Sequence, residues 1–419
     1  MTSTDPTRPH PRRALRITGI VAAGLAVAVA GSYGVARAIP PEFPVVYSER
    51  LPTGTTGSVT IADPAQALTF ARFDAGSGPR VLVVTRYENG VISGIDLTAT
   101  PEATGLTEPI AVFAKLGYQA IQAIAGDSAR PQVTVPATET LTSLDTHSHH
   151  VGIGTNYKEH QAEATIEEPF VFPKIATPTD SDGELAAGTH GLLDYEVELG
   201  IVALDDITTS TGLPEHLGLV LSNDWTDREL LVSQIEPDNL TGGAGFTNAK
   251  SQPGFLTTGD LFVIPADWES YYRKLRLDLF VNDDLRQRAN PSDLIWDVRT
   301  MIEKTLAAGD RTWDSDGTPT TLTAQPGVIP RGTILQTGTP EGVVYRAPST
   351  RQRFLGFMEW AGTLGTNADS VVDSALAVYV REAKDAEVYL KPGDRIVTRA
   401  EGLGQIFTTI TAGERAESE

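Results

Sequence analysis

Short apolar runs, separated by Gly, Pro and Asp residues, dominate the chain from Val151 onward, and this rhythm limits the possible folds more than any other feature of the sequence. Runs of this length with alternating side chains are typical of β-strands, and the residues between them are typical of turns. The runs read HVGIG, YEVELGIVAL, HLGLVLSN, KLRLDLFVN, GTILQTG, DRIVTRA and QIFTTIT. The pattern predicts an α+β body that is rich in strands and has few helices.

Two helical stretches are predicted inside this body, at residues 290–308 and from about residue 351 to 384. The first opens with Asn290 and Pro291, a pair of residues that favours the start of a helix. Both stretches interrupt the strand rhythm of the body.

A smaller strand-rich module precedes the body, with strands predicted at residues 67–73, 80–87 and 90–97. Asn89-Gly90 between the last two strands is a strong hairpin signal, and residues 107–124 have helical spacing. The predicted division is a signal peptide or membrane anchor (1–38), a linker (39–57), an N-terminal β-rich domain (58–140) and a main domain (141–415) with an inserted segment at about 345–389.

Acidic residues outnumber basic ones in this chain, and 54 Asp and Glu against 33 Lys and Arg give a formal net charge of −21. Such a field repels phosphate backbones, so nucleic acid is not an expected partner. An anionic ligand would need a local cation, either a metal ion or a few placed Lys and Arg side chains. Cysteine is absent, which excludes disulfides, thiolate metal sites and cysteine nucleophiles.

The N-terminus has the features of an export signal. A basic stretch with Arg12 and Arg13 precedes residues 17–36, which carry no charge. This run is about as long as a spanning helix needs, and it leads into Ala-Arg-Ala at 36–38, a pattern that suits a signal peptidase. Cleavage and retention as a membrane anchor both stay open. Either one predicts a protein exported across the cytoplasmic membrane, secreted or anchored with its body outside the cytoplasm.

Two glutamates, Glu196 and Glu198, share one face of the predicted strand YEVELGI, while Tyr195, Val197 and Leu199 take the other face. One interpretation is a half-buried strand whose glutamates lie in water, as on many sheet surfaces. The other is that both carboxylates converge on a divalent cation, which would remove the repulsion between them. An all-oxygen ligand set favours Mg²⁺ or Mn²⁺ over zinc.

A polar turn after a predicted strand, in VGIGTNYKEHQAEA, carries His160 and Glu163. Three residues apart on one helical turn, they would face each other, so Glu163 could orient His160. Imidazole is the usual general base near neutral pH. The alternative is a surface helix on which the two residues meet by chance. The spacing does not match HExxH, which argues against a zinc protease.

A third cluster, in LVLSNDWTDREL, places Asn223, Asp224, Asp227 and Arg228 directly after an apolar strand. Charged residues at the end of a strand are also common in ordinary loops, so this stretch alone leaves its role open. The tract THSHH is expected to be incidental, because no second cluster is available to complete a metal shell around alternating His residues.

Taken together, these segments resemble the fumarylacetoacetate hydrolase family. The resemblance rests on GTNYKEHQAE, LDYEVELG, SNDWTDREL, GFTNAKSQPGF, VNDDLRQRANPSDLIWDV, GTILQTGTPEGV and LKPGDRIVTRAEGLG, which occur in the family's order from about His150 to Thr411. Residues 68–97 are similar to the small N-terminal β domain of many members. The resemblance implies a mixed β-sandwich roll with a small N-terminal β domain, assembled as a homodimer.

The resemblance also implies roles for individual residues. Glu196, Glu198 and Asp224 match the family's ligands for a divalent ion, usually Mg²⁺, with Mn²⁺ as the alternative. His160 and Glu163 match the pair that activates water. The residues that match substrate-facing positions of the family are Lys250 toward the carbonyl, Arg228 toward a carboxylate, and Thr339 and Tyr157 in the pocket wall.

The reaction implied by the resemblance is metal-dependent cleavage of a carbon–carbon bond in a small anionic diketo or acylpyruvate-type acid. The same set of groups serves, across the family, decarboxylation or isomerisation of oxaloacetate-like or unsaturated keto acids. A different class of function is a non-catalytic envelope scaffold or ligand sensor that keeps the fold and the metal. Intact His160, Glu163 and Lys250 argue against that alternative.

Overall fold

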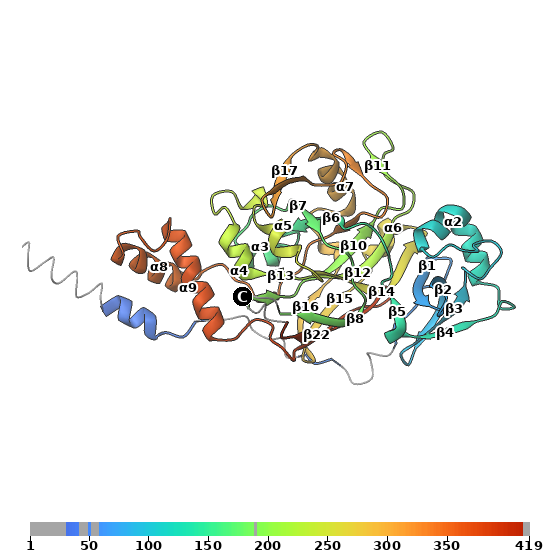
Figure 1. The fold of residues 1–419 in the computed structure, drawn as a ribbon, viewed down its shortest axis with the longest axis horizontal. Helices are drawn as coiled ribbons and strands as arrows, with labels where there is room; N and C mark the ends of the chain where they lie inside the picture. Colours follow the sequence, from blue (N-terminus) through green and yellow to red (C-terminus); the bar gives the residue numbers. More distant parts are fainter. Residues whose placement is uncertain (1–30, 42–48, 52–57, 188–190, 414–419) are drawn as a thin grey trace, which may run out of the picture. The chain divides into compact units, whose positions relative to one another are not determined.

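The computed structural model describes residues 31–41, 49–51, 58–187 and 191–413 (Figure 1). The chain divides into two compact units. The sheet unit consists of Pro44–Ala347 with Ala386–Glu419, and the helical unit consists of Met1–Phe43 with Pro348–Asp385. The strands of the described residues all belong to the sheet unit.

The largest sheet has eleven strands, and its neighbours are antiparallel except for one parallel pair, β20 and β6. Its strands in spatial order are β4 (Val133–Pro136), β3 (Val91–Asp96), β2 (Pro79–Glu88), β1 (Ala67–Asp74), β14 (Leu256–Pro265), β12 (Gly218–Asp224), β10 (Val197–Val202), β20 (Ile334–Gln336), β6 (His149–Gly154) and β7 (Phe170–Ile175), with β5 (Thr140–Leu141) paired to β1. This sheet crosses most of the sheet unit (Figure 1).

A second sheet has five strands, in the order β16 (Asp284–Ala289), β15 (Leu277–Val281), β21 (Arg395–Ala400), β22 (Gly404–Thr411) and β8 (Asp182–Ala186). Three small pairs complete the strands: β11 (Ile207–Thr208) with β19 (Val328–Ile329), β13 (Thr226–Asp227) with β9 (Leu193–Asp194), and β17 (Thr312–Ser315) with β18 (Thr318–Thr321). The predicted strand-rich α+β fold is thereby confirmed.

The middle strands of the large sheet, β14, β12 and β10, are buried along their whole length. The register places Leu199 of β10 opposite Leu221 of β12, and Ile201 opposite Leu219. Strands covered on both faces are expected to be apolar on both faces. A polar side chain on such a strand therefore needs a hydrogen-bond or ion-pair partner to compensate for its lost hydration.

The predicted module at residues 58–140 contains the three expected strands, β1, β2 and β3, and they continue the large sheet. Leu68 of β1 lies opposite Ile264 of β14. Between β2 and β3, Asn89 (φ 53°) and Gly90 (φ 73°) form the predicted two-residue turn. The predicted helix is α2 (Pro109–Ala125), whose apolar residues share one core with the sheet.

The shorter helices of the sheet unit are α3 (Lys158–Ala164), α4 (Arg228–Gln234), α5 (Phe246–Lys250), α6 (Trp268–Tyr272) and α7 (Val298–Ala307), with 3₁₀ turns η2 (Ala137–Glu139), η3 (Leu240–Gly242) and η4 (Pro291–Asp293). The helix predicted from Asn290 is wrong at its start, because only one 3₁₀ turn forms there. The N–H groups of Ile295 and Trp296 instead donate to the backbone and side-chain oxygens of Asn156 (2.9 and 2.7 Å). The α-helix therefore begins after these residues.

The helical unit contains α8 (Thr350–Gly362), α9 (Val371–Asp385) and an α-helical segment at residues 31–38. The single stretch predicted at residues 351–384 is thus two helices. They approach closely at Gly356, where an added Cβ would lie 2.5 Å from the backbone of Ala375. Arg351 joins the parts of this unit, because it pairs with Glu382 (2.8 Å) and donates to the Ala36 carbonyl (2.7 Å).

Most of the predicted export signal, residues 1–30, lies outside the described residues. In the part of the chain that the structure describes, no helix has both the length and the apolar character that crossing a membrane requires. The export signal stays a prediction from the sequence.

Candidate active site

Three carboxylates meet where β10 and β12 lie side by side. Glu198 is on β10, Asp224 ends β12, and Glu196 directly precedes β10. The Asp224 N–H donates to the Glu196 carbonyl (2.9 Å), which extends the ladder between the two strands. One oxygen of each carboxylate lies within 4.8 Å of the others. In the described residues this is the group of acidic, His or Cys side chains that could hold a metal ion.

The interpretation that the glutamates lie on a solvated sheet face is wrong. Glu196, Glu198 and Asp224 are 4%, 2% and 1% exposed. Every residue of β10 is buried, so both faces of this strand are covered, and Glu196 directly precedes it. Buried carboxylates of this kind require hydrogen bonds, ion pairs or a metal ion to compensate for lost hydration.

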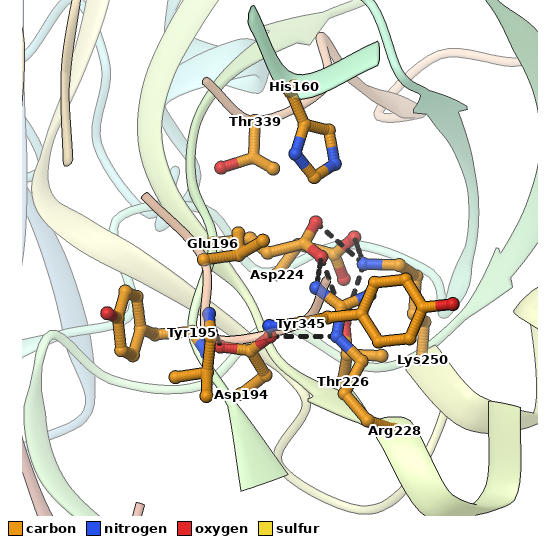
Figure 2. A network of polar contacts seen from close by, with 12 residues as sticks. His160, Asp194, Tyr195, Glu196, Asp224, Thr226, Arg228, Lys250, Thr339 and Tyr345 are labelled. Atoms are coloured by element: carbon orange, nitrogen blue, oxygen red, sulfur yellow. Dashed lines mark hydrogen bonds and ion pairs between the residues drawn. The ribbon is translucent and has the colours of Figure 1, made fainter. Parts of the chain in front are cut away.

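Lys250, the last residue of α5, supplies one of the compensating charges (Figure 2). Its Nζ donates to Glu196 Oε2 and Asp224 Oδ2, both at 2.8 Å, and to the Thr226 hydroxyl at 2.7 Å. These contacts connect α5 to β12 and to the residue before β10. The lysine expected to face a substrate carbonyl is thus also fixed against two of the predicted metal ligands.

A second lysine, Lys174 on β7, is fully buried and contacts Asp224 from the other side. Its Nζ donates to Asp224 Oδ1, to the Lys250 carbonyl and to the Phe255 carbonyl, the last at 2.7 Å. Sequence reasoning missed this residue. The signal was available in FVFPKI, since a lysine inside an apolar strand of a buried sheet needs an acidic partner.

Arg228, the first residue of α4, is also committed to buried carboxylates. Its guanidinium donates to Asp194 at 2.8 Å and to Glu196 Oε1 at 2.5 Å, and it lies over the Tyr345 ring, 5.4 Å from the centroid. Its predicted role at a substrate carboxylate stays a prediction. Asp194, which sequence reasoning missed, also accepts N–H groups from Val344 (3.0 Å) and Tyr345 (3.2 Å).

The buried charges of the site do not balance among themselves. Four carboxylates, from Asp194, Glu196, Glu198 and Asp224, face three cations, from Lys174, Arg228 and Lys250. One negative charge is left over if all seven groups are ionised. A bound cation is one way to compensate such a charge, and protonation of a carboxyl is another.

The pKa values of the two glutamates locate the imbalance. Burial alone would raise the pKa of Glu196, but Lys250 and Arg228 lower it to about 2. Burial, together with the Asp224 and Glu196 carboxylates, raises the pKa of Glu198 well above its ordinary value. Glu198 is therefore the ligand at which positive charge is missing.

The three residues fit a divalent ion by their chemistry. Carboxylate oxygens are the donors that Mg²⁺ and Mn²⁺ prefer, and each oxygen has a second lone pair beyond the one used by a lysine or arginine. The Gly338 N–H donates to Glu198 Oε2 (2.8 Å) and fixes that carboxylate. Glu196, Glu198 and Asp224 would hold the ion, with Lys174, Lys250 and Arg228 as their supporting partners.

His160 and Glu163 form the contact expected from their spacing on α3. His160 Nδ1 lies 3.1 Å from Glu163 Oε2, and His160 is 6% exposed. Figure 2 shows His160 and Thr339 on one side of the Glu196 and Asp224 carboxylates. Lys250 and Arg228 lie on the other side (Figure 2). His160 is thus the buried residue of a helix that is otherwise exposed or half-buried, and the role of the pair stays a prediction.

Thr339 and Tyr157 lie in the same region but differ in their bonding. The Thr339 hydroxyl donates to the Val197 carbonyl (3.2 Å) and accepts from Gln287 Nε2 (2.8 Å). The Tyr157 ring is buried, and its hydroxyl has no hydrogen-bond partner among the described residues. Burial and the nearby Glu198 raise the pKa of Tyr157. Tyr157 therefore has an unused donor for a ligand.

The histidines of THSHH bond to other parts of the fold. His149 Nε2 lies 2.9 Å from the Thr321 carbonyl, and His150 Nδ1 accepts from the Ile334 N–H (3.1 Å). The rings of His147 and His150 stack with centroids 5.2 Å apart. These nitrogens and rings support the β6–β20 region rather than the carboxylate site.

Three buried carboxylates beside a His–Glu pair, in a strand-rich fold, are an arrangement that suits metal-assisted chemistry on small molecules. The model of the family described as Fumarylacetoacetate (FAA) hydrolase C-terminal matches residues 149–411, more than half of the chain, so the chain belongs to this family.

Similar proteins include enzymes with several activities. The homoprotocatechuate catabolism bifunctional isomerase/decarboxylase of Escherichia coli is 28% identical over 186 residues, which cover 41% of this chain and 41% of that protein. The mitochondrial oxaloacetate tautomerase of Oryza sativa subsp. japonica is 28% identical over 214 residues, which cover 46% of this chain and 78% of that protein. The chain spans about half the length of several curated relatives, 58% of one and 41% of another.

A solved structure shows the same fold. The fumarylacetoacetate hydrolase of the psychrophilic Exiguobacterium antarcticum matches with a TM-score of 0.52 at 19% identity, covering 83% of this chain and all of that one. This likeness extends the comparison to the strands before residue 149.

Proposed function

We propose that this protein is a divalent-metal-dependent hydrolase that cleaves a carbon–carbon bond in a small diketo or acylpyruvate-type acid. The observation that carries the proposal is the His160–Glu163 contact of 3.1 Å on α3, beside the buried group Glu196, Glu198 and Asp224. A metal site needs no such pair to bind an ion. A pair of this kind is the usual arrangement of a general base with its orienting carboxylate.

The ligand carboxylates and the base have separate tasks. A bound Mg²⁺ or Mn²⁺ would polarise the oxygens of the keto acid as a Lewis acid. Glu163 accepts a hydrogen bond from the Nδ1–H group of His160, so the unprotonated Nε2 can take a proton from water. The resulting hydroxide adds to the carbonyl carbon, the adjacent C–C bond breaks, and its electron pair leaves as an enolate. The proton that His160 Nε2 took from water passes to the enolate and restores the base.

Anion binding in so acidic a chain requires a locally positive surface. The net charge of −21 repels an anionic acid at long range. Lys250 and Lys174 bring two ammonium groups to Asp224, and Arg228 brings a third cation to Glu196. These groups, with the ion, make the neighbourhood of the carboxylates attractive to an anion. Tyr157 adds a buried hydroxyl that can donate to it.

A second candidate function is decarboxylation or tautomerisation of an oxaloacetate-like acid, or isomerisation of an unsaturated keto acid. The names of the bacterial isomerase/decarboxylase and the plant tautomerase favour it. These reactions need an enolate but no attacking water, so His160 would matter less to decarboxylation.

The test is turnover of acylpyruvates, fumarylacetoacetate and oxaloacetate by the full-length protein with and without Mg²⁺ or Mn²⁺. For a hydrolase, Glu198→Ala abolishes activity and His160→Ala lowers it by about 100-fold or more. Glu184→Ala, on the exposed strand β8, serves as the matched control. Carbon dioxide release that survives His160→Ala but not Glu198→Ala establishes the decarboxylase instead. Metal binding with no turnover of any acid supports the scaffold or sensor.

We further propose that the body of the protein lies outside the cytoplasm, secreted or membrane-anchored, and that it forms a homodimer, as the resemblance to the family implies. The basic stretch with Arg12 and Arg13 before the uncharged residues 17–36 supports export. The test of the compartment is digestion by an added protease in cells whose cell envelope outside the cytoplasmic membrane has been removed. A body outside the cytoplasm is digested, and a cytoplasmic body is protected. Light scattering of the purified protein tests the oligomeric state, and a mass of one chain would refute the dimer.

A further inference from the structure

The segment from Gly342 to Ala347 holds Glu163 by contacts that its pairing with His160 does not need. The Gly342 N–H and Arg346 Nη2 both contact Glu163 Oε1, at 3.0 and 2.6 Å. The Ala347 N–H donates to the Glu163 carbonyl at 3.1 Å. One carboxylate oxygen is thus occupied by this segment, and the other, Oε2, is the one that meets His160.

Arg346 is held ready for this contact by its own segment. Its Nη1 donates to the carbonyls of Val343 (2.6 Å) and Tyr345 (2.8 Å). These two bonds fix the plane of the guanidinium, so little side-chain freedom is lost when Nη2 meets Glu163. The side chain of Glu163 is 12% exposed and that of Arg346 is 30% exposed, so the pair is only partly screened by water.

The same segment is fixed to the buried carboxylates. Val344 and Tyr345 donate their N–H groups to Asp194 (3.0 and 3.2 Å), and Asp194 in turn accepts from Arg228. Gly342 has φ +102°, and an added Cβ would collide with the Arg286 carbonyl. Only glycine fits at this position, and the backbone there is closely packed. The segment therefore gives Arg346 a defined position relative to the candidate metal site.

We propose that Arg346 is a positioning residue for the predicted base: it holds Glu163 so that Oε2 faces His160 Nδ1, and it stabilises α3. This inference rests on the proposed hydrolase function for its kinetic consequences. Its structural consequence, a stably held α3, does not depend on any activity. α3 has only seven residues and no side-chain cap at its N-terminus, so contacts from outside the helix must hold it.

The kinetic arm compares Arg346→Ala, Arg346→Lys and Arg299→Ala in the full-length, Mg²⁺-loaded protein. Arg299 pairs with Glu269 at 2.8 Å on the surface and is the matched control. Arg346→Ala lowers kcat by roughly 10- to 100-fold, within the contribution of a general base, and changes KM little because the carboxylate site is intact. Arg346→Lys recovers part of kcat, and Arg299→Ala leaves both constants unchanged.

The structural arm measures amide hydrogen exchange of α3 in the same variants without substrate. Arg346→Ala speeds exchange of α3 while the β10 and β12 amides keep their wild-type rates. Glu163→Ala speeds it as well, and adding Arg346→Ala to Glu163→Ala produces no further increase, because both residues act through one contact.

The outcomes separate this inference from the proposed function. Faster exchange of α3 with no turnover of any keto acid upholds the positioning role and refutes the hydrolase. Unchanged exchange of α3 in Arg346→Ala overturns the positioning role, whatever the activity. A fall in kcat with faster exchange throughout the sheet unit also overturns it, because Arg346 would then be a general structural residue.

Discussion

Two glutamates separated by one residue are both buried, Glu198 on β10 and Glu196 directly before it. Glu196 is kept ionised by Lys250 and Arg228, whereas Glu198 has a backbone N–H and repulsion from its neighbours. The two side chains are alike in sequence and differ in their partners. A bound cation would therefore act mainly on Glu198, because it would stabilise the ionised form of this carboxylate.

Glu198→Gln tests this difference through thermal stability. The raised pKa means that an ionised Glu198 is unfavourable in the metal-free fold, so Gln leaves that form equally or more stable. Metal at about 100 times its Kd adds about 2.7 kcal/mol to the wild type. The variant gains none of it. Differential scanning calorimetry without Mg²⁺ measures the stability of the metal-free form, and a scan with Mg²⁺ measures the stabilisation by the ion. Glu184→Gln is the control. A stabilisation by Mg²⁺ that is unchanged in Glu198→Gln would contradict the proposed metal site.

Asp260, which is not one of the candidate metal ligands, gives a pH dependence of its own. Its carboxyl accepts from Tyr87 (2.7 Å) and from the Gln405 N–H (2.9 Å). Burial raises its pKa from 3.8 to about 6, so the folded state binds the proton more tightly than the unfolded chain. Its contribution to stability is therefore complete below pH 3.8 and is lost as the pH rises toward 6.

Asp260→Asn removes this dependence while keeping the side-chain shape. Between pH 4 and pH 7 the free energy of unfolding of the variant rises by about 2–3 kcal/mol relative to that of the wild type, since each pKa unit is worth about 1.4 kcal/mol. Urea unfolding of both proteins across this range gives the difference directly, and effects of other carboxyls cancel. A difference that stays constant with pH would show that Asp260 keeps its ordinary pKa.

At the scale of elements, local signals located the turns and most strands, and one helix start was misplaced. The hairpin at Asn89-Gly90 depends on two residues that tolerate positive φ, so the sequence suffices. The start at Asn290 depends on Asn156, which is distant in the sequence and bonds the N–H groups of Ile295 and Trp296. Tertiary hydrogen bonds overruled the local capping signal there.

The boundary of α7 can be tested by two capping substitutions. Asp297 accepts from the Thr300 N–H (2.9 Å), so Asp297→Ala costs about 1 kcal/mol of the free energy of unfolding. Asn290 makes no side-chain cap bond, and Asn290→Ala costs only a few tenths of that. Chemical denaturation of the pair decides the matter: equal losses would place the helix start at Asn290.

At the scale of the whole molecule, the sheet unit and the helical unit are separate compact bodies in one chain. Replacing Pro348–Asp385 by a short Gly-Ser linker should leave the sheet unit folded, because its core lies in its own sheets. The stabilisation by Mg²⁺ should be retained. Gly356→Leu, which forces α8 away from α9, is a milder variant with the same expectation. Loss of the metal effect in both would make the helical unit part of the site.

The sequence by itself determined the strand-rich fold, the family, the hairpin and the group of candidate ligands and bases. The strands and the hairpin depend on local periodicity and turn residues, whereas the family and the roles of Glu196, Glu198 and His160 depend on a resemblance that short motifs along the chain carry. Local spacing fixes which side chains can meet, whatever the rest of the chain does.

Only the tertiary structure decided which charges compensate these groups. Lys174 and Asp224 are 50 positions apart, Arg228 and Asp194 are 34 apart, and the Gly342 N–H meets a carboxylate 179 positions away. Such pairs have no periodic signal, because their partners lie on different elements that meet only in the folded chain, such as Lys174 on β7 and Asp224 on β12. The burial of Glu198 also depends on the fold, since what covers the faces of a strand is not specified by its own residues.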